Sequence, residues 1–315
     1  MPVVRSAGML DLHRVCDERD SRYDGAFVVA VRTTRIYCRP SCAGRPLPRN
    51  RTFLASPEVA RREGYRACKR CKPDSAARLD LEFFGARAVA GIEEVLDGVY
   101  RRTLSDGSVL TSIDDSPLAR RLRDEDADLL AVNEVLSADP LLAPLVAAAP
   151  WRRVPGHVDG FEVAVRAILG QQVSVAAART NLGRLVAQYG DPLDAPSGSL
   201  THRFPTPAAL RDADIAGPRS RAAAIRALAA ADVDLSYGAD PAPLLDLPGI
   251  GPWTASYVAM RALGDRDAFM PTDLGVRHGF EALGLPGDPK SAERYAERWR
   301  PFRSYALAHL WAVQA

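Results

Sequence analysis

Four of the five cysteines form two close pairs, and this spacing limits what the N-terminal part of the chain can fold into. Cys38 and Cys42 are separated by three residues, Cys68 and Cys71 by two, and 25 residues lie between the pairs. Two turns with this spacing present four thiolates to one tetrahedral ion, which predicts a zinc site. Two disulfides are the alternative, but a C-x2-C pair is a poor structural bridge, and a reducing compartment disfavours it. The fifth cysteine, Cys16, lies outside these two pairs, and we expect it to be an ordinary thiol.

The first 76 residues also carry most of the excess positive charge. They contain 16 Lys and Arg against 8 Asp and Glu, whereas the whole chain has a net charge of only +2. A basic segment is a candidate for contact with nucleic-acid phosphates, and equally it can be a solvated surface. Because so short a segment buries little apolar surface, we expect zinc binding to contribute to its folding.

The remaining composition is that of a globular protein with two or three domains. No stretch approaches the ~20 uninterrupted apolar residues of a membrane-spanning helix. The N-terminus lacks the apolar core of a signal peptide, so we expect a cytoplasmic protein with no membrane partner.

The residues around the cysteines read DGAFVVAVRTTRIYCRPSCAGRP and EGYRACKRCKPD. Over residues 20–74 they resemble the zinc-binding N-terminal domain of the Ada family of methylation-response proteins. The resemblance implies that Cys38 takes a methyl group irreversibly from a methylphosphotriester in DNA, and that Thr34, Arg45 and Arg70 contact DNA. Methylation would remove one negative charge from the thiolate site and so reduce repulsion against DNA phosphates. The alternative is a purely structural zinc module that tethers the protein to DNA.

The C-terminal part has a mostly helical pattern. From Ser174 onward, apolar residues recur at intervals of three and four through VSVAAARTNLGRLVAQY, SRAAAIRALAAAD, WTASYVAMRAL and RSYALAHLWAV. Between residues 82 and 112, one helix precedes two short strands, GVYRRTL and SVLTSI. We therefore predict an α+β multidomain fold: a small four-cysteine α/β module (1–76), a short α/β subdomain (77–150) and an all-helical body (151–315).

Two glycines mark a tight hairpin between two helices of that body, in the segment LLDLPGIGPWTASYVAMRAL. Gly249 and Gly251 allow close backbone approach, and the helix that follows begins with unpaired amides, near Thr254. Those amides can bind a DNA phosphate without a lysine, and the hairpin carbonyls can hold a monovalent cation. Taken alone, however, Pro-Gly-x-Gly is equally an ordinary turn between helices.

Asp273 lies 22 residues after Gly251, in the segment AFMPTDLGVRHGF. A hairpin followed at this distance by an Asp resembles the helix-hairpin-helix glycosylase superfamily, which implies that Asp273 faces the scissile sugar. A carboxylate suits this chemistry because cleavage of the base–sugar bond develops positive charge on the sugar. We expect Asp273 to be ionised and to orient the attacking water. It can at the same time be the N-cap of a helix.

Trp253 lies where lyase members of the superfamily have a lysine, and a tryptophan cannot form a Schiff base. The four cysteines of the iron–sulfur branch are also missing, so a monofunctional glycosylase is implied. The segments FFGARAVAGIEEVLDGVYRRTL, VPGHVDGFEVAVRAILGQQVSVAAART and WRPFRSYALAHLW resemble the AlkA-type 3-methyladenine glycosylases. That resemblance implies a monomer acting on double-stranded DNA with alkylated bases, and base-pocket residues at Trp253, Tyr257, Trp311, Gln171 and Gln172.

The sequence departs from these families in four respects. The four-cysteine module runs almost directly into the glycosylase, without the helix-turn-helix region that Ada proteins contain. No PCHR motif supplies a second methyl acceptor. Only two strands are expected where AlkA proteins have a fuller sheet, and Gln172 replaces an apolar wedge that props open the DNA stack. The rival interpretation is a methylation-sensing transcriptional regulator whose inactive glycosylase half only binds lesions.

Overall fold

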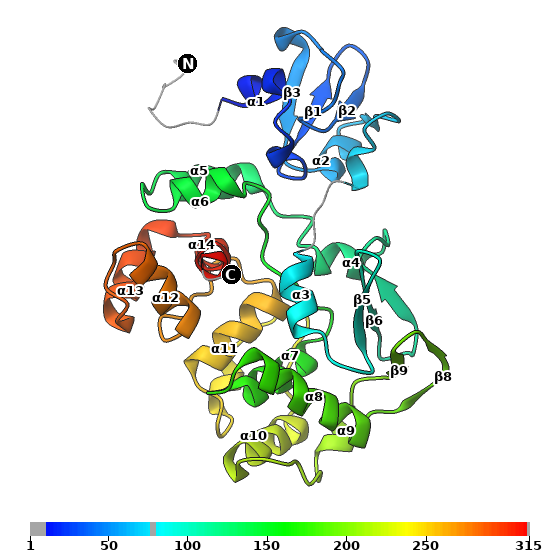
Figure 1. The fold of residues 1–315 in the computed structure, drawn as a ribbon, viewed down its shortest axis with the longest axis vertical. Helices are drawn as coiled ribbons and strands as arrows, with labels where there is room; N and C mark the ends of the chain where they lie inside the picture. Colours follow the sequence, from blue (N-terminus) through cyan, green and yellow to red (C-terminus); the bar gives the residue numbers. More distant parts are fainter. Residues whose placement is uncertain (1–10, 76–79, 314–315) are drawn as a thin grey trace. The chain divides into compact units, whose positions relative to one another are not determined.

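The structure is a computed structural model that describes residues 11–75 and 80–313 (Figure 1). The chain divides into two compact units. Unit 1 comprises residues 1–78, 123–154 and 274–315, and unit 2 comprises residues 79–122 and 155–273. None of the helices in the described residues is long and apolar enough to cross a membrane.

The four-cysteine module of unit 1 is built on a four-stranded sheet. In sheet order its strands are Arg51–Leu54 (β3), Val28–Val31 (β1), Ile36–Cys38 (β2) and Arg66–Ala67 (β4). β1 is antiparallel to both neighbours, and β2 pairs in parallel with β4. The helices Leu12–Glu18 (α1) and Pro57–Arg62 (α2) complete the module, whose small core includes Val28, Ala30, Tyr37, Leu54, Ala60 and Tyr65.

The rest of unit 1 is helical. It contains Leu129–Ser137 (α5), Ala143–Ala148 (α6), Leu274–Ala282 (α12), Pro289–Ala296 (α13) and Arg303–Ala312 (α14). Asp139, between α5 and α6, accepts hydrogen bonds from Trp299 Nε1 at 2.7 Å and from the Tyr295 hydroxyl at 3.2 Å. Two helix groups far apart in the sequence are therefore joined by one carboxylate.

Unit 2 begins with the helix Leu81–Arg87 (α3) and an antiparallel sheet of Glu93–Leu96 (β5), Val99–Thr103 (β6) and Val109–Thr111 (β7), followed by Pro117–Leu122 (α4). The expectation of two strands was wrong, because β5 precedes them. A further hairpin is formed by Pro192–Ser197 (β8) and Leu200–His202 (β9), so the prediction of an all-helical body was wrong. It hydrogen-bonds to the segment before β5, where Thr201 N donates to Gly91 O at 2.8 Å.

Several helices of unit 2 follow the predicted periodic segments, whereas those at residues 160–170 and 207–210 lie outside them. The helices of this part of the chain are Gly160–Gly170 (α7), Val175–Tyr189 (α8), Pro207–Leu210 (α9), Arg219–Ala230 (α10) and Pro252–Val258 (α11), which continues as a π-helical turn over Ala259–Leu263. The side chain of Asp159 caps α7 by accepting from Glu162 N at 2.9 Å. Apolar faces of α7, α8, α10 and α11 form one core that includes Val163, Ile168, Leu182, Ile225, Leu228 and Val258.

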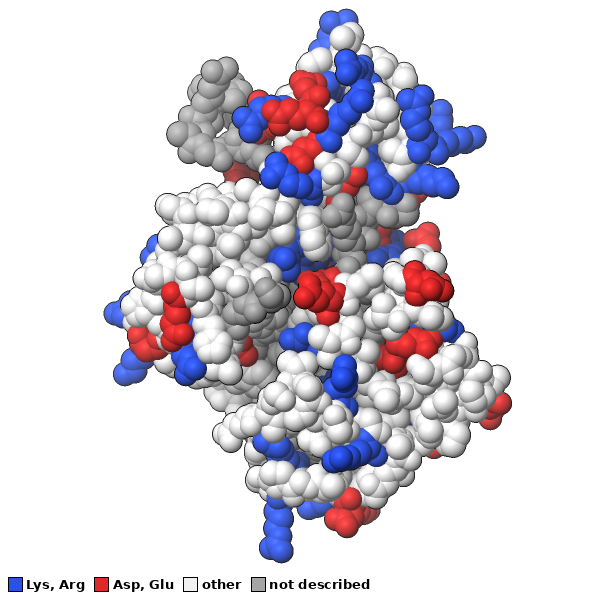
Figure 2. Space-filling model, in the orientation of Figure 1, with Lys and Arg blue, Asp and Glu red and all other residues white. Residues whose placement is uncertain are grey.

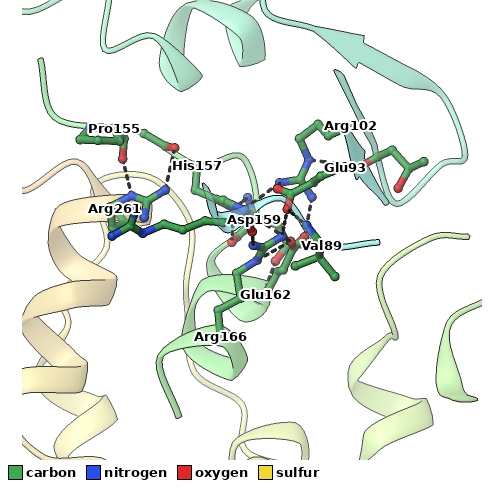
Figure 3. Close-up of polar contacts among 12 residues, drawn as sticks. Val89, Glu93, Arg102, Pro155, His157, Asp159, Glu162, Arg166 and Arg261 are labelled. Carbon is green, nitrogen blue, oxygen red and sulfur yellow. Dashed lines mark hydrogen bonds and ion pairs between the residues drawn. The ribbon is translucent and has the colours of Figure 1, made fainter. Parts of the chain in front are cut away.

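A buried cluster of charges joins the sheet of unit 2 to α7. Figure 3 shows Glu93, Arg102, Glu162 and Arg166 pointing toward one another. Arg166 lies 2.7 Å from Glu93, and Arg102 pairs with Glu162. Burial opposes ionisation, but the two arginines hold the pKa of Glu162 well below its usual range. Two carboxylates and two guanidiniums thus balance in charge where water is excluded.

His157 extends this buried charge cluster toward the chain segment before α7. Its Nε2 lies 2.7 Å from Arg102 NH1, and because arginine can only donate, this nitrogen accepts and carries no proton. Burial and the charge of Arg102 lower the pKa of His157. The imidazole is therefore neutral and fixes the segment at residues 155–159.

We predict that Glu162→Gln lowers the free energy of unfolding by about 3–5 kcal/mol, because it leaves two buried arginines without their full countercharge. Glu281→Gln, which breaks an exposed pair with Arg277, is the matched control and should change the free energy of unfolding by less than about 0.5 kcal/mol. Urea unfolding measures both. The folded pKa of Glu162 is depressed, so its contribution is present above the unfolded pKa of about 4.3 and is lost as pH falls. Equal stability of Glu162→Gln and wild type at pH 7 would contradict the prediction.

Candidate functional sites

The hairpin before α11 is shaped by two glycines with different surroundings. Gly249 has a φ of +80°, and a Cβ there would lie 2.8 Å from the Cβ of Ala224 in α10, so this position requires glycine for both conformation and space. Gly251 is the N-cap of α11 and has no atom within 4 Å of where a Cβ would lie. No side chain caps the first turn of α11, so no capping side chain occupies its amides.

Gln171, at the end of α7, is bound to this hairpin. Its Nε2 donates to Gly249 O and to the Thr254 hydroxyl, both at 3.1 Å. Thr254, which was predicted to contact DNA, is only 2% exposed. Gln172, by contrast, is exposed and has a φ of +56°, an uncommon conformation for a residue with a side chain. The two glutamines thus differ: the first holds the hairpin and the second projects outward.

The structure brings three of the predicted residues together beyond the hairpin. The rings of Trp253 and Tyr257 stack at a centroid distance of 5.3 Å and an angle of 14°. Trp253 Nε1 donates to Asp273 Oδ2 at 2.9 Å, and Asp273 directly precedes α12. The half-buried Trp311 lies in α14 of unit 1. The indole therefore holds one oxygen of the carboxylate and offers a stacked aromatic surface beside it.

Sequence reasoning missed two arginines at this site. Arg261, four residues after Tyr257, donates to the Tyr257 hydroxyl at 2.7 Å and to the carbonyl oxygens of Pro155 and Gly156. Figure 3 shows Arg261 reaching the 155–157 segment. The Arg87 guanidinium lies 3.8 Å from the centroid of the Phe83 ring. The i, i+4 spacing of Tyr257 and Arg261 was the one available signal.

The four cysteines of the N-terminal module converge. The sulfur atoms of Cys38, Cys42, Cys68 and Cys71 lie within 4.8 Å of one another. Cys38 ends β2, while Cys68 follows β4, the parallel neighbour of β2. Backbone amides approach two of the sulfurs: Arg39 N lies 3.4 Å from Cys71 Sγ and Gly44 N lies 3.5 Å from Cys42 Sγ.

The electrostatics of this cluster fit a bound cation. Burial and the neighbouring cysteines raise the pKa of Cys38 far above that of a free thiol. Burial likewise raises the pKa of Cys71 to about 12. Thiolates this close together repel one another, so a positive ion would stabilise them, and an all-sulfur tetrahedral set is one that zinc prefers.

The predicted DNA contacts of the module, Thr34, Arg45 and Arg70, are all exposed. Thr34 lies in the turn between β1 and β2, and Arg70 lies between Cys68 and Cys71. Figure 2 shows several Lys and Arg side chains on the visible face of this module. Other exposed basic residues in the module are Arg14, Arg19, Arg22, Arg32, Arg35, Arg49, Arg61, Arg62, Arg66, Lys69 and Lys72.

Three family models match the chain in the order of its parts. Residues 11–74 match the metal binding domain of Ada, residues 117–159 the AlkA N-terminal domain, and residues 165–303 the HhH-GPD superfamily of base excision DNA repair proteins. The last match includes the hairpin, the aromatic stack and Asp273.

Similar proteins agree with these matches. A Mycobacterium tuberculosis protein named as a probable bifunctional transcriptional activator/DNA repair enzyme AlkA is 33% identical, over 96% of this chain and 95% of its own length. DNA-3-methyladenine glycosylase 2 of Escherichia coli is 38% identical, over 74% of this chain and 92% of its own length. The structure of a 3-methyladenine DNA glycosylase from Archaeoglobus fulgidus has a TM-score of 0.56 at 21% identity, covering 74% of this chain and 91% of that one, and supports the fold.

The fold and the family matches define a helix-hairpin-helix enzyme of base excision DNA repair. More specifically, the chain belongs to the AlkA family of DNA-repair glycosylases, and it carries an Ada-type zinc-binding domain. The predictions of a zinc site and of a DNA-repair glycosylase are confirmed.

We predict that Cys42→Ser loses stoichiometric zinc and unfolds the four-cysteine module, because three thiolates bind the metal less tightly and the small core cannot compensate. Cys16→Ser is the control: Cys16 is not part of the cluster, so that variant should keep both metal and fold. Zinc content after gel filtration and far-UV circular dichroism measure the two effects. Retention of full zinc by Cys42→Ser would show that the site is assigned wrongly.

Proposed function

We propose that this protein removes alkylated purines of the 3-methyladenine type from double-stranded DNA by hydrolysis, with Asp273 as the catalytic carboxylate. The observation that carries the proposal is the hydrogen bond from Trp253 Nε1 to Asp273 beside the stacked Trp253 and Tyr257 rings. This arrangement holds a negative charge next to aromatic surfaces on which a flipped base can stack.

Asp273 would act through its charge. As the bond between C1′ and the base nitrogen breaks, its electrons leave with the base and the sugar becomes positively charged. The carboxylate stabilises that charge and orients a water molecule, whose oxygen bonds to C1′ and which gives up one proton to the surrounding solvent. Trp253, two residues after the final glycine of the hairpin, cannot form a Schiff base, so the proposed reaction stops at the abasic site.

The hairpin would hold the DNA backbone. The uncapped amides at the start of α11 can donate to a phosphate, and Gly251 leaves room for it to approach. We propose a monovalent cation on the hairpin carbonyls, although Gly249 O already accepts from Gln171. Gln172, exposed next to that anchored residue, would occupy the gap left by the flipped base. Trp311 would contribute to base binding.

The four-cysteine module would act on the DNA backbone rather than on bases. Zinc, when bound, keeps the sulfurs as electron-rich thiolates. Cys38 Sγ would form a bond to the methyl carbon of a methylphosphotriester, and the phosphate oxygen would keep the electrons of the broken bond. Thr34, Arg45 and Arg70 would contact the DNA, since all three are exposed. Losing one negative charge at sulfur would then strengthen attraction to phosphates.

A role as a methylation sensor is the second candidate, because the mycobacterial relative is named as a transcriptional activator as well as a repair enzyme. The alignment with that relative spans 473 positions against 315 residues here, so part of it has no counterpart in this chain. We therefore place repair first. We keep the proposed boundaries at 1–76, 77–150 and 151–315 and propose a monomer.

We predict that Asp273→Asn abolishes base release, because the neutral amide cannot stabilise the charged sugar. The assay incubates zinc-loaded protein with duplex DNA containing one 3-methyladenine and scores abasic sites by alkaline cleavage. Asp265→Asn is the matched control: it changes another acidic residue of unit 2 and should leave base release unchanged. If wild type binds the duplex but releases no base, the glycosylase proposal fails and the sensor becomes the better explanation.

We also predict that DNA carrying a methylphosphotriester transfers its methyl group to Cys38. Peptide mass spectrometry should detect one added methyl on the Cys38 peptide, and the Cys16→Ser variant should behave in the same way. Unmodified DNA is the control. An unchanged mass with zinc bound would instead support a structural module.

A further inference from the structure

A groove lies between the end of α12 and α13, two helices of unit 1 that lie side by side (Figure 1). Its floor is mostly apolar, because it is lined by Phe280, Leu285, Pro286 and the ring of Tyr295. The rings of Phe280 and Tyr295 meet edge to face, with their centroids 5.7 Å apart. None of these residues belongs to the excision site or to the four-cysteine cluster, so the two proposed DNA reactions leave the groove without a use.

The floor of the groove is fixed from behind. Phe280 is only 1% exposed, and its ring packs against that of Trp299 with the centroids 5.8 Å apart. The Tyr295 hydroxyl and Trp299 Nε1 donate to the two oxygens of one carboxylate, that of Asp139. A ligand that enters the groove therefore meets a surface that is already formed, and little conformational entropy is lost on binding.

Two exposed arginines, Arg294 and Arg298, line one edge of the groove about one helical turn apart. The Arg298 guanidinium lies 3.6 Å from the centroid of the Tyr295 ring. Within residues 11–75 and 80–313, neither arginine forms an ion pair with a carboxylate, and Glu297, which lies between them, pairs with other arginines. Lys290 adds a third exposed cation one turn before Arg294. Like charges at this spacing repel one another, so the edge is suited to a negatively charged ligand.

The apolar floor and the basic edge together indicate the chemistry of the ligand. Among the residues that the structure describes, no carboxylate lines the groove, so nothing there would repel an acidic group. Duplex DNA could offer phosphates to the arginines, but its bases are stacked inside the helix and would leave the apolar floor uncovered. An acidic peptide supplies carboxylates and an apolar side chain together. Arginine and aromatic residues also contribute most of the binding energy in many protein interfaces.

We propose that the groove between α12 and α13 binds an acidic peptide segment of a partner protein. An apolar side chain of the peptide lies on the rings of Phe280 and Tyr295, and its carboxylates accept from Arg294 and Arg298, since a guanidinium can donate two parallel hydrogen bonds to one carboxylate. Such a contact recruits a second protein to the enzyme without occupying any residue assigned to DNA.

The test measures binding of a fluorescein-labelled peptide, in which four aspartates precede leucine and phenylalanine, to the zinc-loaded full-length protein by fluorescence anisotropy. We expect saturable binding to wild type. The double variant Arg294→Gln with Arg298→Gln should lower the affinity at least about tenfold, the loss expected for one charge-assisted hydrogen bond. The matched control, Arg211→Gln with Arg219→Gln, removes the same charge from exposed positions of unit 2 and should bind like wild type.

The variant Leu285→Ala tests the apolar floor separately and should weaken peptide binding severalfold, because less apolar surface is buried. Melting temperature reports whether each variant is folded. No peptide binding by wild type, or wild-type affinity in the double variant or in Leu285→Ala, overturns the proposal. An equal loss of affinity for labelled, undamaged duplex DNA in the double variant would assign these arginines to nucleic acid instead. A wild-type dimer that the double variant converts to a monomer in gel filtration would assign the groove to a second copy of this chain.

Discussion

The buried pairing of Glu93, Arg102, Glu162 and Arg166 supports everything around it in unit 2. Removing four charges from water is costly, and only their close mutual contacts offset that cost. The positions of the four side chains are therefore tightly constrained, because a displaced partner would leave an uncompensated charge in an apolar core. The sheet, α3 and α7 are therefore held in one arrangement.

From this cluster a chain of contacts leads to the proposed catalytic group. Neutral His157 lies beside Arg102, and the carbonyl oxygens just before it accept from Arg261. Arg261 holds the Tyr257 hydroxyl, Tyr257 stacks on Trp253, and the indole donates to Asp273. Each contact restricts the next one, so the carboxylate of Asp273 has a defined orientation at the end of this series of contacts.

Parts of this architecture were predictable because their signals are local. Cysteine spacing and helical periodicity depend on neighbours in sequence, and the hairpin glycines indicated the turn before α11. The strand β5 was missed because Glu93 and Glu94 look solvent-exposed, whereas Glu93 is buried against Arg166. β8 contains two prolines and reads as a loop. Arg87 and Arg261 were missed for a similar reason: an arginine is recognised as part of a site only when its tertiary partners are known.

The division of the chain has a consequence for the order in which it can fold during synthesis. Unit 2 is complete once residue 273 has been made, whereas unit 1 includes residues 274–315. Asp139, translated much earlier, meets Tyr295 and Trp299 only after the last helices emerge. Until then α5 and α6 lack their partners, and their apolar faces are open to other chains or to chaperones. A ribosome that stalls near residue 273 would therefore release a product in which unit 2 has all of its residues and unit 1 does not.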